Sequence, residues 1–101
     1  MMVEFSILPI GEEAHISKYI AAAVKIVHES GIDYRLTPMG TILVGEWEPT
    51  MEVVRQCHEA VRQMSDRVMT KIKIDDFTGA ERLPEEKVNA VEKLLGFEVK
   101  K

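Results

Sequence analysis

The sequence predicts an α+β domain, because a β-hairpin lies between two helical segments and one further strand lies at each end. The hairpin falls near residues 33–46, where two short runs rich in β-branched and apolar residues flank the turn Pro38-Met39-Gly40. Apolar residues at helical spacing precede and follow this hairpin, and apolar residues alternate near both residue 5 and residue 70. Right-handed crossovers in the order βα-ββ-αβ place both helices on one face of a four-stranded antiparallel sheet. This arrangement is the ferredoxin-like βαββαβ sandwich.

The first strand is expected over residues 3–9 and the first helix over residues 16–30. Alternation in the strand puts Val3, Phe5 and Ile7 on one face and Glu4, Ser6 and Leu8 on the other. The helix carries apolar residues at a spacing of three or four, namely Ile16, Ile20, Ala23, Val24 and Val27. Gly31 suits the left-handed residue that ends such a helix.

The hairpin strands are expected over residues 33–37 and 41–46, and Gly40 is expected to have a positive φ in the turn between them. A second helix follows from about Pro49 to Met64, and a fourth strand from Arg67 to Asp75. A last helix begins at Pro84 and stops at Gly96. Its predicted buried face contains Val88, Val91 and Leu95.

Bulk composition restricts the function classes. A chain of 101 residues predicts one domain, residues 1–101, and a net charge of -4 argues against a nucleic-acid partner. The apolar runs are too short to span a membrane, and the N-terminal residues lack the pattern of a signal peptide. The single cysteine, Cys57, excludes an intramolecular disulfide and fits the reducing cytoplasm.

Catalytic and metal motifs are not found. Two His-Glu pairs occur at residues 28–29 and 58–59, but Ile32 and Arg62 stand where a zinc protease needs its second histidine. We expect both pairs on solvated helix faces. Cys57 lies on the apolar stripe of the second helix and is therefore expected in the core. The sequence predicts neither an enzyme, a metal site nor a bound cofactor.

The second face of the predicted sheet has only the C-terminal helix available to cover it. That face is half apolar, with Leu8 and Met69 among Glu4, Ser6, Lys71 and Lys73. Such a face packs on another subunit or holds a ligand, and the pattern favours subunit packing, which does not exclude a ligand. Glu4 with the hydroxyl groups of Ser6, Thr37 and Thr41 suits a polar ring that carries a positive charge. Trp47 between Glu46 and Glu48 is the second candidate for a cationic ligand, although the pattern favours a role as an anchor of the corner between strand and helix.

Several segments resemble, in order and spacing, the thiamine-binding protein family, a group of small ferredoxin-like proteins from bacteria, archaea and fungi. The resemblance covers about residues 3–95. It rests on residues 6–11 and 19–23, Pro38-Met39-Gly40-Thr41, Gly45-Glu46, His58-Glu59-Ala60, Asp66-Arg67-Val68 and residues 71–76. The chain departs from many relatives at Phe77, where they carry an arginine after the Asp-Asp pair.

This resemblance implies a cytoplasmic, non-catalytic protein that binds thiamine or its hydroxymethylpyrimidine part. It also implies a homodimer or homotetramer in which sheets meet, with the ligand at the sheet surface near the hairpin turn. The ligand neighbourhood that it implies contains Glu4, Ser6, Thr37, Met39, Thr41 and Lys73. Glu4 is expected to pair with the positive charge or to accept a hydrogen bond from the ring amine. The three hydroxyl groups supply neutral hydrogen bonds, and Met39 forms an apolar wall.

Two alternatives of other classes remain at this level. One is a small enzyme on the same fold, either a sheet-face monooxygenase or an acyl-phosphate hydrolase. A hydrolase of that kind needs an arginine in the loop after the first strand, and residues 9–13 provide only glutamates as charged groups. The other is an assembly or regulatory subunit whose open face only packs on copies of the chain.

Overall fold

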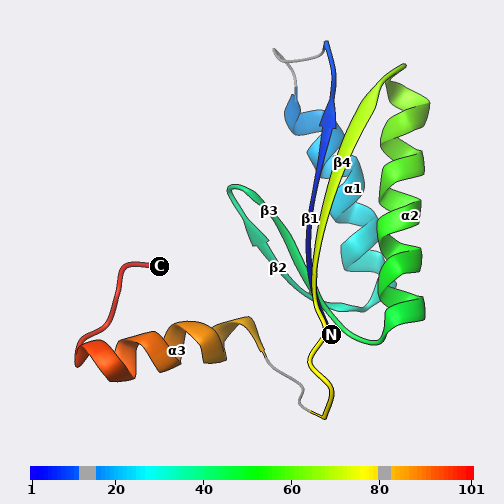
Figure 1. The fold of residues 1–101 in the computed structure, drawn as a ribbon. Helices are drawn as coiled ribbons and strands as arrows, with labels where there is room; N and C mark the ends of the chain where they lie inside the picture. Colours follow the sequence, from blue (N-terminus) through cyan, green and yellow to red (C-terminus); the bar gives the residue numbers. More distant parts are fainter. Residues whose placement is uncertain (12–15, 80–82) are drawn as a thin grey trace.

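The computed structural model describes residues 1–11, 16–79 and 83–101, and it has the predicted ferredoxin-like architecture. The four strands form one antiparallel sheet in the order β2-β3-β1-β4, with α1 and α2 on one face (Figure 1). The elements are β1 (Met2–Pro9), α1 (Ile16–Ser30), β2 (Asp33–Thr37), β3 (Gly40–Val44), α2 (Trp47–Met64), β4 (Val68–Asp75) and α3 (Pro84–Leu95). In the described part of the chain, no helix is both long and apolar enough to cross a membrane.

The core lies between the sheet and the pair α1 and α2. The predicted inner residues of β1 are buried, and the inner faces of the helices meet them. The buried apolar residues of the helices are Tyr19, Ala23 and Val27 in α1, and Val53, Val54, Cys57 and Val61 in α2. Ile20 was expected on the inner stripe of α1, but it is 38% exposed because Tyr19 occupies the inward position. The thiol of Cys57 donates a hydrogen bond to the carbonyl oxygen of Ala23 at 3.3 Å and so joins the two helices.

The helix α3 differs from the sequence prediction. None of its residues is buried, so the expectation that Val88, Val91 and Leu95 face a core is wrong. Figure 1 shows α3 extending away from the sheet. The radius of gyration is 15.1 Å, whereas a compact chain of this length has a value of about 13 Å. The periodicity of α3 indicates an apolar stripe, which the described residues leave unburied.

His28, Glu29 and Glu59 are exposed, as expected, and His58 is half-buried. Both helix histidines also join elements. His28 Nδ1 lies 2.7 Å from the hydroxyl of Tyr34, and His58 Nδ1 lies 2.6 Å from the hydroxyl of Thr70. The first contact links α1 to β2 and the second links α2 to β4. Both imidazoles therefore have structural partners.

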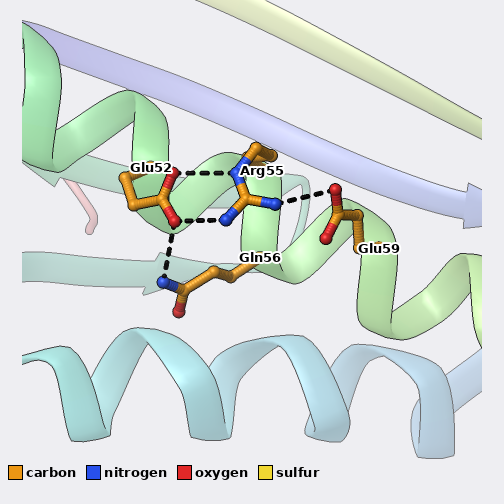
Figure 2. Close-up of polar contacts among 4 residues, drawn as sticks. All are labelled: Glu52, Arg55, Gln56 and Glu59. Carbon is orange, nitrogen blue, oxygen red and sulfur yellow. Dashed lines mark hydrogen bonds and ion pairs between the residues drawn. The ribbon is translucent and has the colours of Figure 1, made fainter.

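The outer face of α2 carries a polar network around Arg55 (Figure 2). The guanidinium donates to both carboxylate oxygens of Glu52 and, at 2.8 Å, to Glu59. The amide of Gln56 donates to Glu52 at 3.1 Å. These hydrogen bonds, with that from Arg55 the strongest, lower the pKa of Glu52 from 4.5 to about 2.

Candidate functional site

The open face of the sheet brings charged side chains of β1 and β4 together. Glu4 pairs with Lys73 in the antiparallel register, and Ser6 pairs with Lys71. Residues directly opposite one another on antiparallel strands point to the same face, with Cβ atoms about 5 Å apart. Glu4, Ser6, Lys71 and Lys73 therefore form one block, which we call the quartet. On the other side of Glu4, the opposite residue of β3 is Ile42.

Gly40 has no side chain and lies close to β1 and to Glu4, beside the quartet. A Cβ atom at this position would lie 2.9 Å from the carbonyl oxygen of Phe5 and 3.5 Å from Cγ of Glu4. A side chain here would thus occupy the surface next to Glu4. The φ of Gly40 is not positive, so the expectation from turn geometry is wrong. The close approach of β3 to β1 is the reason that glycine fits here.

Thr37 fixes the position of Gly40 through its hydroxyl group. The hydroxyl donates to the carbonyl oxygen of Gly40 at 2.7 Å. It also accepts hydrogen bonds from the backbone N–H groups of Met39 at 3.3 Å and Gly40 at 3.1 Å. The hydroxyl proton is therefore used within the turn, and Thr37 acts as a positioning residue at the edge of the open face.

Thr41 and Met39 lie apart from the quartet. Thr41 pairs with Phe5, whose side chain faces the helices, and only 6% of Thr41 is exposed. A ligand on the open face does not reach its hydroxyl, because successive side chains of a strand point to opposite faces. Met39 is at the tip of the hairpin and is 85% exposed. Of the six predicted residues, the structure thus brings together Glu4, Ser6 and Lys73, with Thr37 adjoining.

Lys71 is the residue that the sequence prediction of the site omitted. The signal was available, since alternation along residues 68–75 already places Lys71 on the same face as Lys73. Neither lysine has a carboxylate within ion-pair distance among the described residues. Arg35 is different, because it donates to Asp33 at 2.6 Å, to the carbonyl of Tyr34 at 2.8 Å and to Glu85. The free cationic groups near Glu4 are therefore those of β4.

The structure gives less support to the other candidates, which are Trp47, Cys57 and a metal site. Trp47 is the first residue of α2 and is 50% exposed. Burial raises the pKa of the Cys57 thiol from 9.0 to about 11, which makes it a poor nucleophile. In the described ranges, no three histidine, cysteine or acidic side chains gather as a possible metal site. Glu12 and Glu13, which were expected in the loop after the first strand, lie outside the described residues.

Comparison with known proteins identifies the family. The profile of the family described as thiamine-binding protein matches residues 3–92. The chain belongs to the thiamine-binding protein family. A relative from Methanothermobacter thermautotrophicus, named a UPF0045 protein, is 40% identical, and the alignment covers 91% of this chain and 96% of the relative.

Solved structures of this family share the fold. A hypothetical protein from Methanocaldococcus jannaschii has a TM-score of 0.83 at 29% identity, with 91% of this chain and 95% of the other covered. A Thermotoga maritima protein, provisionally described as a thiamine biosynthesis or salvage protein, has a TM-score of 0.79 at 26% identity. The second alignment covers 89% of this chain and 96% of the Thermotoga protein.

Proposed function

We propose that this chain binds thiamine or its hydroxymethylpyrimidine part without altering it, as a homo-oligomer in the cytoplasm. The observation that carries the proposal is the position without a side chain at Gly40, beside the carboxylate-bearing Glu4, in a chain that belongs to the thiamine-binding protein family. The description of the Thermotoga relative supports the same ligand class.

The open face offers thiamine a surface at Gly40, which we call the seat, and a charge partner in Glu4. An aromatic ring would lie against the backbone at Gly40, which has no side chain of its own, and beside the side chain of Glu4. The carboxylate of Glu4 then accepts a hydrogen bond from the ring amine or faces the thiazolium charge, and the hydroxyl of Ser6 supplies a neutral hydrogen bond. Thr37 and Lys73 border this seat. Desolvation of the seat by a second subunit would strengthen the electrostatic contribution.

Exposed apolar groups support the homo-oligomer. Leu8 and Met69 are opposite each other on the open face and are 40% and 45% exposed. They lie next to the quartet, so a subunit that covers them also encloses the proposed seat. A face with both acidic and basic groups suits contact with a copy of itself, because each sign finds its opposite across a two-fold axis.

Isothermal titration with thiamine and with hydroxymethylpyrimidine tests the proposal. The carboxylate of Glu4 is charged, so Glu4→Gln should weaken thiamine binding about tenfold or more. Glu29→Gln is the matched control, because Glu29 is an exposed glutamate of α1, on the other side of the sheet. Thr41→Val should leave affinity unchanged, since its hydroxyl lies on the covered face.

Two results would contradict the proposal. Absence of a measurable heat and of a ligand-dependent melting shift with either compound would favour the assembly subunit instead. Equal affinities of the wild type, Glu4→Gln and Glu29→Gln would place the site elsewhere, and Trp47 would be the next residue to substitute.

A further inference from the structure

We propose that the site prefers a phosphate ester of thiamine over thiamine, with Lys71 and Lys73 as the phosphate-binding groups. This inference rests on the proposed function and names the ligand class of the same seat. The observation behind it is a pair of neighbouring lysines on the open face that have no ion-pair partner among the described residues.

The quartet carries two ammonium groups and one carboxylate. Lys71 and Lys73 are two residues apart on β4 and point to one face, so their Cα atoms lie about 7 Å apart. Neither side chain has an ion-pair partner among the described residues. Glu4 is the carboxylate directly opposite Lys73. Asp75 lies on the same face two residues after Lys73, so this face carries two ammonium groups and two carboxylates in all. Unesterified thiamine would add a positive charge to this face and leave both lysines without a partner.

A phosphate ester supplies one partner for both lysines. A phosphate monoester carries a charge of about -1.5 to -2 at neutral pH and has three strong acceptor oxygens. Flexible lysine side chains from adjacent positions on one face can both reach one phosphate, each as a point charge. The thiazolium can still face Glu4, so that each charged group of the ligand has a partner of opposite sign.

The geometry also orients the ligand. The position without a side chain, Gly40, is on β3, and the free lysines are on β4, with β1 between them. Neighbouring strands are separated by about 4.8 Å, so the two places lie about 10 Å apart across the sheet. That span suits a ligand with an aromatic ring at one end and a phosphate at the other. The β2 side cannot provide the anion site in this arrangement, because the guanidinium of Arg35 is held by Asp33 and Glu85.

Titration of the full chain with thiamine, thiamine monophosphate and inorganic phosphate tests the preference. We expect thiamine monophosphate to bind at least tenfold more tightly than thiamine in dilute buffer, and we expect this ratio to fall as salt is added. Lys71→Gln and Lys73→Gln should each reduce the ratio several-fold. Lys87→Gln is the matched control, because Lys87 is an exposed lysine of α3 outside the quartet. Circular dichroism melts of each variant establish that it is folded.

The outcomes separate this inference from the proposed function. Equal affinities for thiamine and its monophosphate would overturn the phosphate preference and leave the thiamine site standing. A preference that persists in both lysine variants would also overturn it, because the phosphate would then contact other groups. Failure of both organic ligands to bind would overturn the proposed function itself.

Discussion

The carbonyl oxygen of Phe5 leaves no room for a methyl group at residue 40. The Cβ of an alanine would approach this oxygen to 2.9 Å, and backbone atoms cannot move aside as a flexible side chain can. We expect Gly40→Ala to lower the free energy of unfolding by about 1–3 kcal/mol, as is usual for overpacking. Denaturant unfolding measures this, with Met39→Ala at the exposed turn tip as the control. Equal stabilities for the two variants would show that β3 and β1 separate easily.

Cys57 should be unreactive in the folded protein. Its side chain is buried and its pKa is raised to about 11, so the thiolate is scarce at pH 8. A thiol reagent such as Ellman's reagent should modify the native protein far more slowly than the protein unfolded in urea. Rapid labelling of the folded chain would mean that α1 and α2 separate readily.

At individual positions, the sequence showed which residues matter better than it showed the physical reason. Glycine at position 40 was attributed to a positive φ, but the constraint is the distance to a neighbouring strand, which one strand's sequence does not contain. Thr41 was grouped with Glu4 because both are polar. The strand register puts Thr41 opposite Phe5, on the covered face. A shift of one residue along a strand is enough to reverse the face.

Among the elements, α2 depends on its outer face as well as on its buried stripe. The Arg55 guanidinium depresses the pKa of Glu52 to about 2, so the contact stabilises the folded state when Glu52 is ionised. A depressed carboxyl pKa gives stability that is complete above the ordinary value of 4.5 and is lost as the pH falls towards about 2. The stability difference between the wild type and Arg55→Gln should follow this course.

Unfolding curves from pH 7 to pH 2 measure that difference. Arg67→Gln removes the same charge from an exposed site and serves as the control. A difference that stays constant down to pH 2 would mean that Arg55 acts through packing and not through Glu52.

The helix α3 is tied to the sheet by Arg35, which donates a hydrogen bond to Glu85. A helix of 12 residues is marginal in water without tertiary contacts. Arg35→Gln should therefore speed amide hydrogen exchange over residues 84–95 and leave α2 unchanged. Hydrogen exchange with mass spectrometry provides the measurement, and equal rates in both proteins would show that other contacts hold α3.

Most element boundaries followed from the sequence because local signals define them, although β3 ends at Val44 and not at residue 46, and α2 begins at Trp47 and not at Pro49. Alternation, helical spacing and Gly31 located β1, α1 and β2 to within one residue. The burial of α3 was not predictable in the same way. An apolar stripe indicates that a helix packs one face against something. It does not indicate whether that surface belongs to the same domain.

For the whole molecule, only the folded structure shows which residues of β3, β1 and β4 are neighbours in the candidate site. Single strands predicted which residues share a face, but the register decided that Lys73 is opposite Glu4 and that Lys71 is opposite Ser6. The same register leaves Leu8 and Met69 side by side without cover. The proposed seat and the apolar patch thus lie on one continuous face.

That continuity leads to a prediction about assembly. A second copy on the open face should bury about 2,000 Å² or more in total, as stable homodimers do. Light scattering at micromolar concentration should then give twice or four times the chain mass of 11.5 kDa. Leu8→Lys should lower the mass, because it puts a charge in the contact. Ile20→Lys is the matched control, since Ile20 is 38% exposed, close to the 40% of Leu8, but is on α1. A mass of 11.5 kDa for the wild type, or equal loss of assembly in both variants, would show that the open face is not where copies meet.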